Sequence, residues 1–84
     1  MQNIWIIKAT YLTDYQLKLE FSNGAQGVAD LKDHLNKPIF TPLQNLDYFK
    51  NFKVNSWTIE WPNGADFAPE FLYEQTSFEN KPAA

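Results

Sequence analysis

Two Asn-Gly steps constrain this chain more than any other feature, because each follows an alternating segment of the same pattern. Leu17 to Ala25 and Trp57 to Ala65 share the skeleton apolar–x–Leu/Ile–Glu–aromatic–x–Asn–Gly–Ala. Asn-Gly tolerates the positive φ angles that both central positions of a type I′ turn require. The sequence therefore predicts two β-hairpins, with structural turns at Asn23-Gly24 and Asn63-Gly64. The repeat is either a duplicated functional site or the same turn chemistry used twice.

The first hairpin has the clearer pattern. Apolar residues alternate with polar ones from Tyr15 to Phe21, which is the period of a strand with one buried face. A loop of two residues would pair Phe21 with Gln26 and Leu19 with Val28. This pairing continues the apolar face across the turn, so we expect it in the structure.

The second hairpin raises the question of an acidic surface. The same loop length pairs Glu60 with Phe67 and places Trp61 opposite Asp66. Asp66 is a candidate cap for the backbone that follows. Glu70 falls in the first turn of the next predicted helix, where a negative charge is favourable. These structural roles are favoured, and the alternative is that Asp66 and Glu70 form an interaction surface.

The tryptophans allow two interpretations. Trp57 and Trp61 are four residues apart and fall on one face of the strand predicted over 57–61. Each ring either packs in the core or is exposed as an anchor for a partner, because Trp is common among binding hot spots. Trp5 has the same two alternatives.

Helix signals occur in three places, and the first is Asp30, which suits an N-cap with Asp33 in the first turn. Thr41, Pro42 and Gln44 match the N-cap, N1 and N3 positions of a capping box. Pro69 suits the first position of a last helix. Helices are expected over 30–35, 41–50 and 69–74.

The order of elements predicts the fold class. Further strands are expected over 4–12 and 52–54, which gives the order β-β-β-α-(α)-β-β-α. This order is typical of an α+β domain. We expect a small, mostly antiparallel sheet of about five strands with two or three short helices on one face. Residues 1–74 are predicted to form a single domain, and residues 75–84 a poorly ordered C-terminal tail.

Charge and composition argue against several function classes. The chain of 84 residues has seven lysines, no arginine and ten carboxylates, for a net charge of −3. Phosphate and guanine recognition relies on arginine, and the lysines are scattered, which argues against direct nucleic-acid binding by this chain alone. There is no basic-then-apolar N-terminus and no apolar run of about 18 residues. A cytoplasmic protein without membrane contact is therefore expected.

No residue pattern predicts catalysis. His34 is the only histidine, and nothing in the sequence brings a serine to it as a nucleophile–base pair requires. Cysteine is absent, and the usual metal sites need several His or Cys residues at fixed spacing. The carboxylates of Glu60, Asp66 and Glu70 lack the ladder of oxygen ligands found in a calcium loop. We expect no enzyme, metal or cofactor, and the candidate interaction residues are Trp57, Trp61, Asp66 and Glu70.

One pattern extends over most of the chain. It includes Asp14-Tyr15-x-Leu17-x-Leu19-x-Phe21, Val28-Ala29-Asp30-Leu31 and Pro38-Ile39-Phe40, and its most specific part is Trp61-Pro62-Asn63-Gly64-Ala65-Asp66. Over about residues 4–74 the pattern resembles the bacterial domain-of-unknown-function family 2442. The resemblance implies a short α+β domain that occurs alone or, in some relatives, before a helix-turn-helix DNA-binding domain. It also implies genes that lie beside those of another small family, as in toxin–antitoxin pairs.

Two functional hypotheses follow. The first is a non-enzymatic binding module, one component of a two-gene toxin–antitoxin-like system, which complexes a small protein partner encoded nearby or forms a homo-oligomer. The alternative is a sensory or ligand-binding domain that in longer relatives regulates an attached helix-turn-helix. Turn chemistry is the preferred explanation of the first Asn-Gly step. If the domain has a site, we expect it between Trp61 and Glu70.

Overall fold

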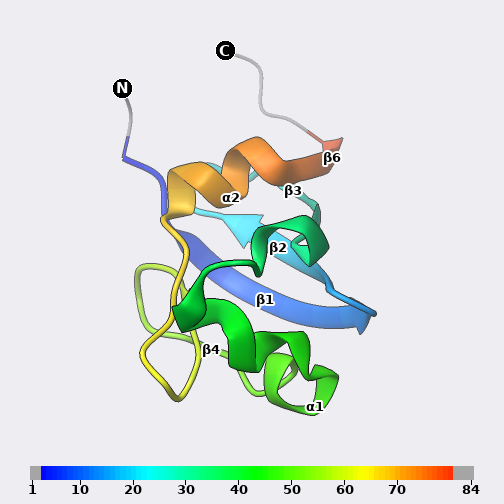
Figure 1. Cartoon of the computed structure of the whole chain (residues 1–84). Coiled ribbons are helices and arrows are strands. Elements are labelled where there is room, and N and C mark those ends of the chain that lie inside the picture. Colours follow the sequence, from blue (N-terminus) through cyan, green and yellow to red (C-terminus); the bar gives the residue numbers. More distant parts are fainter. Residues whose placement is uncertain (1–2, 81–84) are drawn as a thin grey trace.

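The computed structural model describes residues 3–80 and has the predicted α+β fold (Figure 1). One antiparallel sheet of four strands has the order β1-β2-β3-β6, and a separate sheet of two strands pairs β4 with β5. The expectation of about five strands in one sheet is thereby replaced by two sheets. The strands are β1 (Ile6–Thr13), β2 (Gln16–Phe21), β3 (Gln26–Asp30), β4 (Lys53–Val54), β5 (Ile59–Glu60) and β6 (Thr76–Asn80).

The four-stranded sheet has one buried and one polar face. Leu17, Leu19 and Phe21 alternate along β2 and are completely buried, as the period of the sequence predicts. The opposite face carries charged side chains that pair across strands, with Lys18 Nζ lying 3.4 Å from a Glu79 carboxylate oxygen. The helices lie over the buried face: α2 packs against β3, and η2 and α1 lie together farther along the sheet (Figure 1). The helical elements are η1 (Lys32–His34), η2 (Pro38–Gln44), α1 (Leu46–Phe49) and α2 (Pro69–Gln75). The first is shorter than the helix expected over 30–35, because Asp30 is the last residue of β3 and Leu31 takes the N-cap position.

The predicted capping box at Thr41 is wrong. Pro38 begins the 3₁₀ helix η2 earlier, so Thr41 already lies inside a helix and cannot act as its N-cap. The cap of α1 is Asn45, whose side chain accepts hydrogen bonds from the backbone N–H groups of Asp47 and Tyr48. The last helix begins with Pro69 at its first position, as predicted.

The first Asn-Gly loop has three residues rather than two. The Gly24 N–H donates to the Phe21 carbonyl at 2.9 Å, and the Phe21 N–H donates to the Ala25 carbonyl at 2.9 Å. Gly24 has a φ of +89°, whereas Asn23 is not among the residues with positive φ. This is the hairpin in which a type I turn is followed by a left-handed glycine, and not the predicted type I′ turn. The pairing moves by one residue, so that Leu19 lies opposite Gly27.

The second Asn-Gly loop repeats this geometry. The Gly64 N–H donates to the Trp61 carbonyl and the Trp61 N–H donates to the Ala65 carbonyl, both at 2.9 Å. Gly64 has a φ of +85°. Glu60 consequently pairs with Asp66, and the predicted pairing of Glu60 with Phe67 is wrong by one residue.

The asparagines explain why both loops have this form. Each Asn side-chain oxygen accepts the N–H of the alanine two residues later, at 3.0 Å in both turns. Each side-chain nitrogen then holds the turn to another part of the chain. Asn23 Nδ2 donates to the Tyr73 hydroxyl, and Asn63 Nδ2 donates to the Ile39 carbonyl. The shared sequence skeleton is therefore explained by shared turn chemistry.

Strand β6 corrects the prediction of a disordered tail from residue 75. Residues 76–80 pair with β3 and form the last strand of the sheet, and residues 81–84 lie outside the described part of the chain. Gly27 is the residue that lets β6 approach, because a Cβ at this position would lie 2.3 Å from the Ser77 carbonyl oxygen. Phe78 faces inward and contacts Phe21, with ring centroids 6.1 Å apart.

Candidate functional site

The structure separates the two tryptophans that were predicted to share a strand face. Trp61 is 1% exposed, and its indole Nε1 donates to the Phe49 carbonyl at 2.8 Å. Trp61 is therefore a core residue and not an anchor for a partner. Trp57 is 45% exposed and lies before β5. The reason is a turn in which Asn55 Oδ1 accepts the N–H of Trp57, while Ser56 has a φ of +80°.

Three exposed apolar residues lie on neighbouring backbone segments where this turn reaches the sheet. The Ile6 N–H donates to the Trp57 carbonyl at 2.9 Å, which places Trp57 beside the first residue of β1. Trp5 and Ile7 flank Ile6 and are 41% and 55% exposed. We call Trp5, Ile7 and Trp57 the tryptophan surface. The sequence indicates Trp5 and Trp57 as possible anchors, but it does not predict the backbone hydrogen bond between Ile6 and Trp57 that brings their segments together.

The two candidate carboxylates occupy different environments. Asp66 is exposed, and it does not cap α2, since Ala68 is the N-cap residue and provides no side-chain hydrogen bond. Glu70 is half-buried in the first turn of α2, where the sequence placed it. Within residues 3–80, no group of three or more His, Asp or Glu residues is arranged to hold a metal ion.

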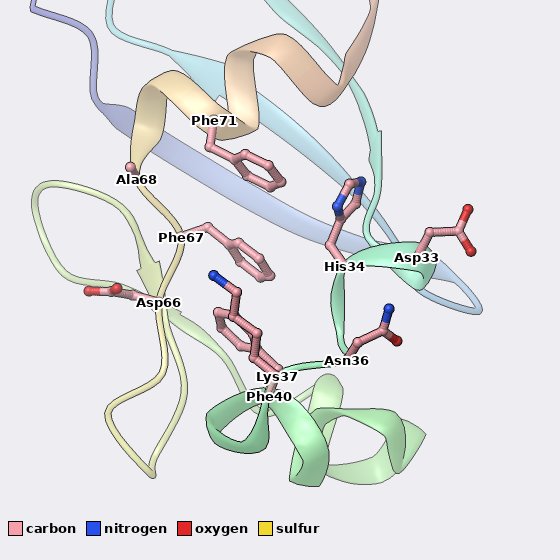
Figure 2. A pocket seen from close by; sticks show the side chains of 9 residues that line it. All are labelled: Asp33, His34, Asn36, Lys37, Phe40, Asp66, Phe67, Ala68 and Phe71. Atoms are coloured by element: carbon pink, nitrogen blue, oxygen red, sulfur yellow. The ribbon is translucent and has the colours of Figure 1, made fainter.

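A hollow of about 350 Å³ lies beside Asp66, between η1, the start of η2 and the segment that enters α2 (Figure 2). Its apolar wall is formed by three phenylalanines. The Phe40 and Phe67 rings are 4.5 Å apart and nearly parallel, at 6°. The Phe67 and Phe71 rings are 5.5 Å apart at 11°. His34 meets Phe71 edge-on, with centroids 5.0 Å apart, so the lone histidine contacts an aromatic ring.

The polar rim of the hollow comes from residues near the start of η2 and from Asp66. Figure 2 shows the carboxylates of Asp33 and Asp66 pointing away from the rings, whereas Lys37 extends toward Phe67. Among the described residues, no carboxylate lies within 4.0 Å of the Lys37 ammonium group. Asn36 completes the rim and has no hydrogen-bond partner in the described part of the chain.

The sequence predicts the part of this hollow that comes from the stretch between Trp61 and Glu70, but not the part on the other side. Asp66 and Phe71 lie within or next to the stretch in which a site was expected. Phe40 and Lys37 come from a segment that carried no site prediction. The available signal was Pro38, which marks a turn that brings Lys37 and Phe40 toward α2. Local periodicity gives no information about such a contact, because it joins segments about thirty residues apart.

Comparisons with known proteins place the chain in a family without assigning an activity. A family model described as a protein of unknown function (DUF2442) matches residues 6–77. No match was found among curated proteins or among solved structures. Within the described residues, no helix is long and apolar enough to cross a membrane. Because the family model covers most of the chain, from the start of β1 into β6, this chain belongs to the DUF2442 family.

Proposed function

We propose that this chain is a non-enzymatic, cytoplasmic binding module that docks a small protein partner through the tryptophan surface. The observation that carries the proposal is the exposure of two of the three tryptophans on neighbouring backbone segments. Tryptophan supplies a large contact area and is enriched among binding hot spots. Exposed apolar groups that gather at one place are typical of protein interaction sites.

The charges around the surface support a protein partner. Lys8 is exposed beside Ile7 and its ammonium group lies 4.0 Å from a Glu20 carboxylate oxygen, so charged groups border the apolar residues. An apolar centre with a polar rim is the usual anatomy of an interface. A partner encoded beside this gene, as in a toxin–antitoxin-like pair, is the natural candidate.

Co-expression with the product of the adjacent gene tests this proposal. We expect the two proteins to elute together in size-exclusion chromatography with light scattering, at the mass of a complex. The double substitution Trp5→Ala and Trp57→Ala should weaken the complex by at least about tenfold, the effect of losing 1.4 kcal/mol. Leu12→Ala is the matched control, because Leu12 is 43% exposed but lies near the end of β1 that is far from Trp5. Two separate species, or equal losses in both variants, would contradict the proposal.

The hollow favours a second function, that of a ligand-binding domain. Pockets that bind small molecules combine apolar walls with a few polar groups, and the hollow has both. NMR titration with a metabolite library tests this function. Shifts at residues lining the hollow are expected, and a library that moves none of them would count against it.

A further inference from the structure

We infer that the hollow binds a small aromatic carboxylate. The inference rests on the second proposed function, to which it gives a ligand class, and it is independent of the tryptophan surface. Three features of the hollow lead to this ligand: the arrangement of the phenyl rings, the position of its charged groups and its size.

The phenyl rings favour an aromatic ligand. Phe40, Phe67 and Phe71 form a continuous column, with neighbouring rings within 11° of parallel. Rings stacked in this way turn their edges outward, and the edge of a phenyl ring carries partial positive charge. In Figure 2, Phe67 and Phe71 extend toward the side of the hollow where His34 lies. The negative face of a ligand ring complements this wall in the edge-to-face geometry that aromatic pairs prefer.

The charged groups favour an anion. The carboxylates of Asp33 and Asp66 point out of the hollow in Figure 2, and Lys37 extends toward the rings. Because Lys37 has no carboxylate within 4.0 Å among the described residues, its ammonium group is available to a ligand. Asn36 also lines the hollow, but Figure 2 shows its amide turned away from the rings and from Lys37, so the positive charge of Lys37 carries this part of the inference. An ammonium group suits a carboxylate, since hydrogen bonds between charged groups are stronger than neutral ones.

The volume of the hollow limits the size of its ligand. A volume of about 350 Å³ lies near the lower end of the range of small-molecule pockets. This space fits one ring with a short acidic arm, such as phenylacetate. The hollow is open on one side, so the expected affinity is modest.

Titration of the isotope-labelled protein with phenylacetate tests the inference, and phenylacetamide is the neutral isostere. We expect phenylacetate to shift the amide signals of residues 33–40 and 66–71 and to bind about three- to tenfold more tightly than phenylacetamide. Lys37→Met keeps the apolar stem and removes the charge, so it should abolish this preference. Lys53→Met, which removes an exposed lysine from β4, should leave it unchanged.

The outcomes separate this inference from the function on which it rests. Equal binding of phenylacetate and phenylacetamide, or shifts outside the hollow, would overturn the carboxylate assignment. Another outcome is that library molecules of another class shift the amide signals of the residues lining the hollow, while phenylacetate does not. In that case the ligand class is wrong and the ligand-binding function stands. If neither phenylacetate nor the library shifts the hollow, both are wrong. If a peptide that ends in phenylalanine binds more tightly than phenylacetate, the small-molecule assignment is wrong and the ligand is the C-terminus of a protein chain.

Discussion

Gly27→Ala should destabilise the domain, although replacing glycine by alanine in a strand is ordinarily favourable. Alanine loses less backbone entropy on folding, which alone would stabilise the protein by about 0.5–1 kcal/mol. Here the new Cβ would lie 2.3 Å from the Ser77 carbonyl oxygen and 2.6 Å from Thr76 Cγ2. An ordinary contact begins at 3.4 Å, so β6 must move away from β3 by about 1 Å.

The magnitude follows from what this movement breaks. Overpacking of a close contact typically costs about 1–3 kcal/mol. A displacement of this size also lengthens the hydrogen bonds between β3 and β6, each contributing about 1 kcal/mol. When the favourable entropy term is subtracted from these losses, the free energy of unfolding should fall by roughly 2–3 kcal/mol. For a domain of this size, that loss lowers the melting temperature by roughly 8–24 °C.

Urea and thermal unfolding followed by circular dichroism measure the effect, and hydrogen exchange locates it. Amides of β6 should lose protection first. Thr76→Ser is the matched second change, because it removes Cγ2 and keeps the hydroxyl that donates to the Leu72 carbonyl at 2.6 Å. In the Gly27→Ala background, Thr76→Ser should recover part of the lost free energy of unfolding. A double-mutant cycle would show this as a coupling between the two positions. A Gly27→Ala protein as stable as the parent, with β6 still protected, would refute the reasoning.

Three further substitutions test the packing, the turns and the sheet surface. Trp61→Phe removes the indole donor of the Phe49 carbonyl and leaves a buried acceptor unpaired; urea denaturation should show a loss of about 1–3 kcal/mol. Gly64→Ala meets no atom within 4 Å but keeps a φ of +85°, so backbone strain alone should cost about 1–2 kcal/mol in thermal melts. Lys18→Ala breaks a solvent-exposed ion pair with Glu79 and should change stability by less than about 1 kcal/mol, an effect that added salt reduces further.

Local sequence predicted the hairpins but not their register. Asn-Gly suits both a two-residue type I′ loop and a three-residue loop with a left-handed glycine. The choice depends on which face of β3 meets the core. In the structure that face carries Ala25, Gly27 and Ala29, because α2 packs against it and β6 pairs closely with the edge of β3, and Val28 faces the other way. The sequence contains these small residues, but the close approach of α2 and β6 belongs to the tertiary structure, which local patterns do not predict.

The contrast between local sequence signals and tertiary packing applies also to the last strand and to the candidate site. Thr76 and Phe78 alternate with Ser77 and Glu79, a short signal that the nearby C-terminal end obscured. The second turn and α2 were predicted, so half of the hollow lay in the expected stretch. The other half depends on η2, which begins at Pro38 rather than at the stronger helix signal of Thr41. The ring contact between Phe40 and Phe67 joins segments far apart in the sequence, and local patterns do not predict it.

The place of β6 in the sheet has a consequence for biosynthesis. Its partner β3 ends at residue 30, and β6 ends at residue 80. On a ribosome that adds about 5–20 residues per second, the nascent chain carries β3 with one open edge for about 3–10 s. Gly27 and Ala29 have low β propensity, so this edge is a weak template for other nascent chains. The small residues that admit β6 are therefore also expected to limit the pairing of this edge with other chains until β6 has been made.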